Sequence, residues 1–85
     1  MQKYELTVVL DAKATPAKKK ALGEQVTKLV KVLEGKIEKE EDWGEKDSGQ
    51  LLHFLLELES VSVKSLSTKL NGEEAIKKHL LIKKQ

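Results

Sequence analysis

The chain opens with a run in which apolar and polar positions alternate. Four apolar side chains follow one another at every second residue from Tyr4 to Leu10. A period of two places such side chains on one face of a strand. We therefore predict a strand with one buried face over residues 4–10.

The next segment changes to a helical period. Thr15 and Pro16 predict a helix start, with threonine as the N-cap and proline at the first helical position. Apolar residues then recur at spacings of three and four as far as Leu33, which predicts an amphipathic helix ending near Glu34. Gly35 follows at the place where helices commonly end on a left-handed residue, so we expect it to be that stop.

A charged segment follows this helix. Residues 36–43 contain only two apolar side chains, Ile37 and Trp43. Charged strands at the edge of a sheet resist unwanted pairing, so we predict an edge strand here. Residues 44–49 are predicted to be a hairpin connection, with Ser48-Gly49 as the turn signal.

The remaining pattern predicts a strand, a short helix and a last strand. Residues 51–59 alternate most strongly, and their second face is partly apolar, which indicates a central strand. Residues 61–70 have an apolar side at helical spacing, and Asn71-Gly72 should end that helix. Residues 76–82 predict the final strand.

The predicted order is strand, helix, strand, strand, helix, strand. This order is typical of an α+β, ferredoxin-like βαββαβ fold. We expect a four-stranded antiparallel sheet with the first and third strands central and both helices on one face. A chain of 85 residues is expected to form a single domain over residues 1–85.

The basic residues limit the kinds of nucleic-acid contact that the chain can make. All sixteen are lysines, and the net charge is only +2. Lysine contacts phosphate as a point charge, whereas arginine forks onto phosphate or onto guanine edges. The composition therefore favours contacts with a nucleic-acid backbone over reading of bases.

The sequence carries little that points to catalysis. His53 and His79 are expected on the open face of the sheet, solvated and roughly 10 Å apart, because one strand lies between theirs. The chain has no cysteine, no Gly-rich phosphate loop and no nucleophile elbow. We predict a protein with no catalytic residue, metal, cofactor or small-molecule substrate. It also lacks a signal-peptide pattern and an apolar run of about 20 residues, so we expect a cytoplasmic protein without a membrane span.

The open face of the predicted sheet shows no aromatic residue, which disfavours stacking of RNA bases on it. An apolar patch of Val9, Leu51 and Leu55 would suit self-association. Trp43, the only tryptophan, lies in an acidic segment. Two interpretations of it stay open: a partly exposed anchor for a partner, or a cover for the end of the core.

Charge separates along the chain. Residues 34–47 hold seven acidic residues against three lysines, which suits a basic partner. Lys77, Lys78, Lys83 and Lys84 lie on and after the last strand, near Lys3 on the neighbouring strand. Five lysines along one sheet edge are a candidate phosphate-binding surface, although edge lysines also serve to prevent aggregation.

Three stretches carry a resemblance that spans nearly the whole chain. They are KYE at residues 3–5, GKI leading to EDWG at residues 35–44, and IKKHLLIK at residues 76–83. The EDWG stretch is the most specific of the three. Together they resemble the family of the sixth protein of the bacterial ribosomal small subunit, a ferredoxin-like family.

The resemblance implies a structural role in the cytoplasmic ribosome. Members of this family form a heterodimer with the eighteenth small-subunit protein and bind the central domain of small-subunit ribosomal RNA. On charge and position, we expect RNA backbone contacts from Lys3, Lys77, Lys78, Lys83 and Lys84. For the small basic protein partner we expect contacts from Glu41, Asp42 and Trp43.

Two departures from the family's pattern keep alternatives open. After the Trp-Gly pair the family usually carries basic residues and a Leu-Ala-Tyr-Pro-Ile segment, whereas here residues 45–49 lead almost directly to Leu51. Arginine, normally present in the family, is missing. The alternatives are an engineered scaffold derived from the family, without RNA binding, and a ferredoxin-like regulatory domain that associates with itself.

Overall fold

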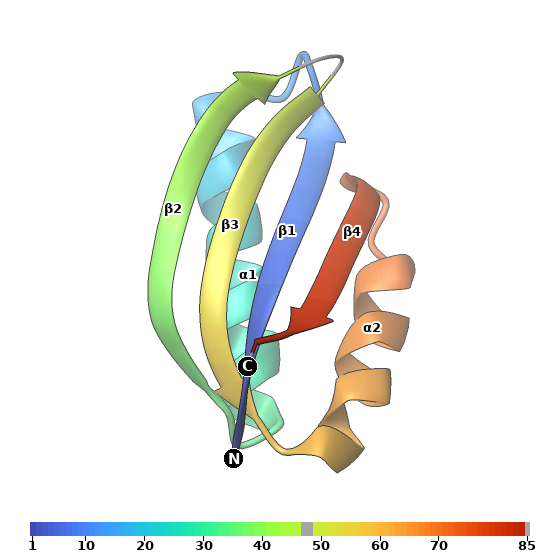
Figure 1. Ribbon diagram of the computed structural model, residues 1–85. Coiled ribbons are helices and arrows are strands. Elements are labelled where there is room, and N and C mark those ends of the chain that lie inside the picture. Colours follow the sequence, from blue (N-terminus) through green and yellow to red (C-terminus); the bar gives the residue numbers. More distant parts are fainter. Residues whose placement is uncertain (47–48, 85) are drawn as a thin grey trace.

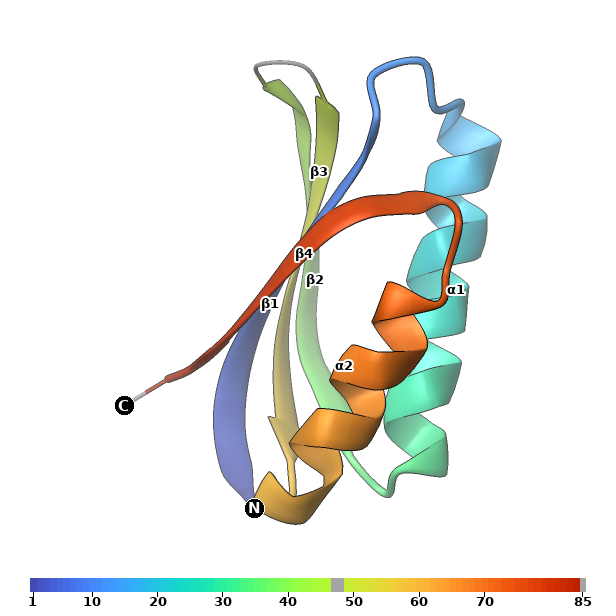
Figure 2. The same cartoon turned by 90° about the vertical axis from the view of Figure 1, so that its right-hand side faces the viewer.

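The computed structural model describes residues 1–46 and 49–84. A four-stranded sheet with the strand order β2-β3-β1-β4 is paired antiparallel throughout. Both helices lie on one face of the sheet, and the other face is open (Figures 1 and 2). The predicted βαββαβ order, with the first and third strands central, is confirmed. The elements are β1 (Gln2–Asp11), α1 (Pro16–Val32), β2 (Lys36–Lys46), β3 (Gly49–Leu58), a 3-10 turn (Ser60–Ser62), α2 (Val63–Asn71) and β4 (Ile76–Lys83).

The core lies between the sheet and the two helices. Every second residue of β1 and of β3 points into it, as the alternation predicts, and Tyr4 and Phe54 are both buried. Burial of such apolar side chains is the main term that favours folding of a small chain. The buried apolar side chains are Tyr4, Leu6, Val8, Leu10, Leu22, Val26, Val30, Leu52, Phe54, Leu56, Leu58, Leu66 and Leu70.

Helix α1 starts as predicted but stops differently. The Thr15 hydroxyl accepts a hydrogen bond from the Lys18 backbone N–H at 3.2 Å, which confirms the N-cap. At the other end the left-handed residue is Glu34, with φ of 63°, and not Gly35. The Gly35 N–H donates to the carbonyl of Val30 at 2.8 Å, which closes the helix end as a Schellman motif.

Gly35 is required for space. A Cβ at this position would lie 2.6 Å from the carbonyl oxygen of Glu57 and 2.8 Å from side-chain atoms of Val30 and Leu58. Backbone cannot move aside as a flexible side chain can. The glycine therefore allows the end of α1 to pass close to β3, a reason that the sequence pattern did not show.

Other boundaries differ slightly from the predicted ones. β2 continues to Lys46, so Gly44 lies inside a strand and not in a hairpin loop. Of the predicted Ser48-Gly49 turn, Gly49 is the first residue of β3, and Ser48 lies outside the described residues. Helix α2 begins at Val63, after a 3-10 turn, and is held by its buried Leu66 and Leu70. None of the described helices is long and apolar enough to cross a membrane.

Edge strand β2 is interrupted twice by bulges. The pairing with β3 shifts between Ile37 and Lys39 and again between Asp42 and Gly44. Each shift adds one unpaired residue to β2, namely Glu38 and Trp43. A bulge bends a strand and locally disrupts its pairing, and the second bulge lies at the site described next.

Candidate functional site

The open face of the sheet gathers several side chains that the sequence analysis singled out. The register sets His53 of β3 between Glu41 of β2 and Thr7 of β1, and sets Thr7 beside Leu80 of β4. Paired residues in an antiparallel sheet point to the same side. These four residues therefore form one row across the middle of the open face.

Trp43 lies flat on this row. Its indole ring stacks on the His53 imidazole, with 4.2 Å between ring centroids and 9° between ring planes. Strand alternation places Trp43 on the open face, two residues after Glu41, and the bulge leaves it without a paired residue in β3. About half of the Trp43 surface, 50%, stays exposed. Of the two interpretations left open, cover of the core end is wrong, and a partly exposed aromatic on the sheet face remains. The expectation that the open face carries no aromatic residue is also wrong.

His53 is not the solvated side chain that we expected. It is only 6% exposed, because Trp43 covers it. Its Nε2 atom lies 3.6 Å from Oε1 of Glu5 on β1. Within residues 1–46 and 49–84, its Nδ1 atom has no hydrogen-bond partner. Local sequence patterns could not indicate this burial, since it depends on the Trp43 ring of a different strand.

His79 also lies elsewhere than expected. β4 pairs it with Val8, a core residue, so it points to the helix side of the sheet and not to the open face. There its Nε2 atom lies 3.1 Å from the Ser67 hydroxyl of α2. The two histidines are thus on opposite sides of the sheet. No group of three metal-ligating side chains occurs among the described residues.

The apolar patch on the open face is larger than the sequence showed. Val9, Leu51 and Leu55 are half-buried there. Leu80 and Ile82 of β4 extend the patch and are 54% and 49% exposed. Together with Trp43 they give this face the apolar surface with polar surroundings that is common at protein interfaces.

The five predicted RNA-binding lysines divide between different surfaces. The register places Lys3 and Lys78 on the open face, and strand alternation adds Lys84, whose N–H donates to the Lys3 carbonyl at 2.8 Å. Lys83 pairs with Tyr4 and points to the helix side. Lys77 is the extra residue at a register shift. The structure therefore does not bring the five together.

Even the open-face lysines lie at two ends of the sheet. Six residues separate Lys78 from Lys84, which is roughly 20 Å along a strand. Lys3 and Lys84 border one hollow together with Glu38, and the Lys3 ammonium lies 3.6 Å from the Glu38 carboxylate. Lys77 borders another hollow. An RNA backbone that crosses this face would therefore contact lysines at two separate ends of the sheet and not one continuous basic surface.

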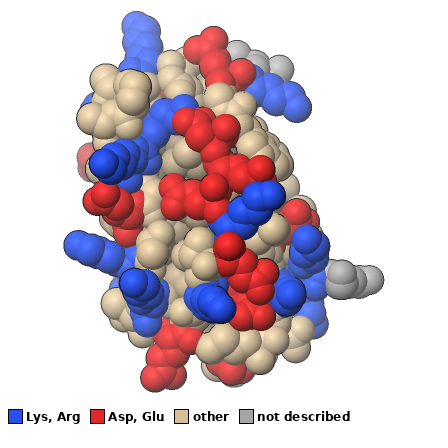
Figure 3. Space-filling model, turned by 90° about the vertical axis from the view of Figure 1, so that its left-hand side faces the viewer, with Lys and Arg blue, Asp and Glu red and all other residues tan. Residues whose placement is uncertain are grey.

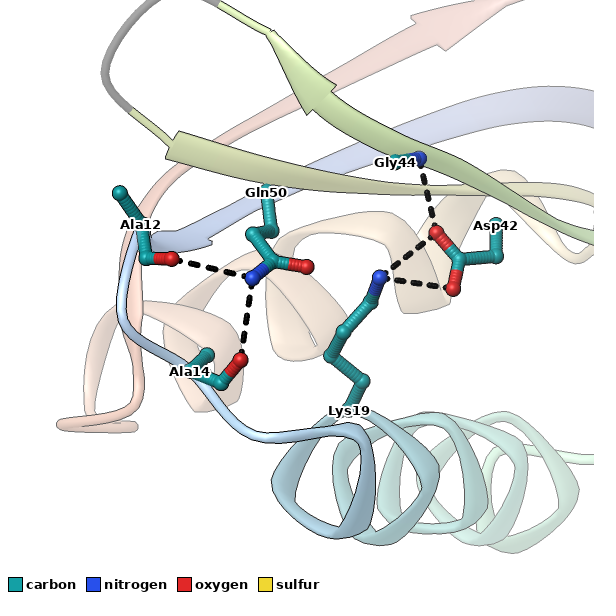
Figure 4. Close-up of polar contacts among 6 residues, drawn as sticks. All are labelled: Ala12, Ala14, Lys19, Asp42, Gly44 and Gln50. Atoms are coloured by element: carbon teal, nitrogen blue, oxygen red, sulfur yellow. Dashed lines mark hydrogen bonds and ion pairs between the residues drawn. The ribbon is translucent and has the colours of Figure 1, made fainter.

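Asp42, one of the predicted partner contacts, turns to the helix side. It pairs with the core residue Leu52, and its carboxylate lies 2.7 Å from the Lys19 ammonium of α1 (Figure 4). It also accepts a hydrogen bond from the Gly44 N–H at 2.8 Å. The hydrogen bonds from Lys19 and Gly44 hold the pKa of Asp42 below its ordinary value. Asp42 thus anchors α1 to β2, while Glu41 and Trp43 face the open side.

The acidic stretch of β2 is largely paired within the chain. Glu41 lies 3.6 Å from the Lys39 ammonium. Glu40 points to α1, where its carboxylate occupies the space beside Gly23. On the side of the molecule where β2 lies, acidic and lysine side chains alternate over the surface (Figure 3). The expected block of free negative charge is therefore partly neutralised.

Gln50 has a structural role that the sequence analysis missed. Its side-chain amide donates to the carbonyls of Ala12 and Ala14, each at 3.0 Å (Figure 4). It thereby fixes the loop between β1 and α1. A glutamine at the start of a strand gives no local signal of such a contact.

Comparison with known proteins decides the family. The family model of ribosomal protein S6 matches residues 3–83. The chain belongs to the ribosomal protein S6 family. It is accordingly a structural component of the small ribosomal subunit in the cytoplasm and not an enzyme. No curated protein sequence matches the chain.

Solved structures share the fold of this S6-family chain at low sequence identity. The crystal structure of 30S ribosomal protein S6 from Thermotoga maritima has a TM-score of 0.87 and 16% identity, over 98% of this chain and 87% of that chain. The solution structure of the C-terminal domain of the MgtC protein from Mycobacterium tuberculosis has a TM-score of 0.78 and 10% identity, over 99% and 88%. The P2 domain of the chemotaxis kinase CheA from Thermotoga maritima has a TM-score of 0.68 and 14% identity, over 98% of both chains.

Proposed function

We propose that the chain binds the central domain of small-subunit ribosomal RNA together with the eighteenth small-subunit protein. The observation that carries this proposal is the family match over residues 3–83. The exposed lysines on β1 and β4 support contacts with the RNA backbone. The half-exposed Trp43 and the neighbouring Glu41 support contacts with a basic protein.

The two partners would use neighbouring parts of one face. On charge and position we assign RNA backbone contacts to Lys3, Lys78 and Lys84, with Lys77 and Lys83 reaching RNA only past the outer edge of β4. Trp43 and Glu41 supply the protein contacts. Asp42 contributes indirectly, because its bonds to Lys19 and Gly44 fix the bulge that carries Trp43.

The experiment is a salt titration of binding to a central-domain RNA fragment, with and without the protein partner. The double variant K78Q/K84Q removes two positive charges from the open face. It should weaken binding and reduce the slope of log K against log salt by roughly 0.7–0.9 for each phosphate that is no longer neutralised. The matched control is K28Q/K64Q, since both lysines are exposed on the helices.

A result in which both double variants lose affinity equally would contradict the assignment to β4. No binding of the native chain under any condition would reject the proposed function. It would favour the two alternatives, an engineered scaffold without RNA binding and a self-associating regulatory domain. For the second, the exposed Leu80 and Ile82 provide an apolar surface. The molar mass in solution, measured by sedimentation over a range of concentrations, would then show whether the chain forms dimers.

A further inference from the structure

His53 is the one buried polar side chain in the described part of the chain, and the fold provides little for its polarity. Its Nδ1 atom is without a hydrogen-bond partner among the described residues. A buried nitrogen of this kind opposes folding and calls for an explanation. A leucine, as at the neighbouring open-face positions 51 and 55, would fill the space without that penalty.

An imidazole differs from leucine in one way that matters at this position. It has a flat aromatic ring, and the indole of Trp43 lies on that ring at 4.2 Å, nearly parallel to it. The ring acts on Trp43 directly, because the two rings are in contact.

We propose that His53 is a positioning residue for Trp43. Its ring holds the indole flat on the sheet, so that the outer face of Trp43 is presented to the protein partner in one orientation. The role in docking rests on the proposed function, whereas the positioning itself is a property of the free chain.

The location of Trp43 explains why positioning is needed. Trp43 is the unpaired residue of a bulge in an edge strand, and half of its surface is exposed. A large side chain that is free to change rotamer loses that freedom on binding, which weakens association. Stacking on a buried ring removes this loss before the partner arrives.

The first test uses the free chain, in which Trp43 is the only tryptophan. Acrylamide quenching of its fluorescence and its near-ultraviolet circular dichroism are measured at pH 7. In the native chain the quenching constant should be low, because one face of the indole is covered. H53F keeps an aromatic ring under the indole, so quenching should stay low. H53L keeps only the bulk, so quenching should rise toward that of an exposed indole and the dichroism should fall.

The matched control is H79L, the same substitution on the other side of the sheet. It should leave the quenching of Trp43 unchanged. If H53L does not fold, as judged by far-ultraviolet dichroism, H53N supplies a polar side chain without an aromatic ring. Equal quenching in the native chain and in H53L or H53N would overturn the proposal, as would quenching in H53F as strong as in H53L.

The second test measures affinity for the eighteenth small-subunit protein. H53L should lower it about 3- to 10-fold, the loss expected when one large side chain must be immobilised on binding. H53F should restore it. Unchanged affinity in H53L would overturn the docking role. Absence of binding by the native chain would instead reject the proposed function, while the free-chain measurements still decide the positioning.

Discussion

The two faces of the sheet differ in how regularly their residues are arranged. The face covered by α1 and α2 is regular: β1 and β3 place an apolar residue there at every second position, and the side chains are almost completely buried. The open face is irregular, since two bulges in β2 interrupt its pairing with β3 and leave Glu38 and Trp43 unpaired. The core thus depends on local periodicity, whereas the surface offered to partners depends on how strands pair.

The largest expected difference between the faces is in stability. Phe54 is fully buried on the covered face, and Leu80 is 54% exposed on the open face. F54A should lower the free energy of unfolding by about 3–5 kcal/mol, because apolar burial is removed and a cavity is left behind. L80A should lower it by less than about 1 kcal/mol, since this side chain is little buried. Denaturant unfolding of both variants checks this, with F54L as the milder change if F54A does not fold. Similar losses of stability in F54A and L80A would mean that the open face is part of the core.

A smaller effect is expected where a helix approaches the sheet. G35A places a methyl group against the Glu57 carbonyl, and we expect a destabilisation of about 1–3 kcal/mol from overpacking. The control is G23A in α1, where the added methyl group meets only the flexible, exposed end of Glu40. Alanine is the better helix former by about 1 kcal/mol, so G23A should be neutral or stabilising. The stability of both variants is measured by thermal and denaturant unfolding. Equal losses of stability in G35A and G23A would contradict this explanation.

The smallest expected effect concerns the ion pair between the covered side of β2 and α1. The pKa of Asp42 is lower in the folded chain than its ordinary value of 3.8. The ionised carboxylate therefore contributes fully to the free energy of unfolding above pH 3.8. This contribution is lost as the pH falls through the lower pKa of the folded chain. D42N should thus be slightly less stable than the native chain at pH 7, by about 0.5 kcal/mol or less for an exposed pair, and the difference should vanish in acid. E45Q, an exposed change in the same strand, should show no such trend. Free energies of unfolding from pH 7 to pH 2 make the comparison.

Much of the fold could be predicted from local patterns. The Thr15-Pro16 helix start and the strand alternation at residues 4–10 were confirmed, as was that predicted for residues 51–59, except that the strand ends at Leu58. The candidate site could be predicted only in part. Trp43 was recognised as unusual, but its stack on His53 depends on how β2 pairs with β3, and no periodicity in a charged segment indicates that pairing.

The lysines show the same limit. Lys77, Lys78, Lys83 and Lys84 are neighbours in sequence, yet strand alternation and one register shift send them to different sides of β4. The sequence gives the number of these lysines but not the side of the sheet to which each side chain points.

The sequence alone determined the order of elements, the residues of the core and the family, because each of these depends on side-chain type and spacing along the chain. Only the tertiary structure decided that Trp43 covers His53, that Asp42 bonds to α1 and that His79 faces α2. Each of these contacts joins residues from different elements, and the register between strands, which sets them, is a property of the folded sheet as a whole.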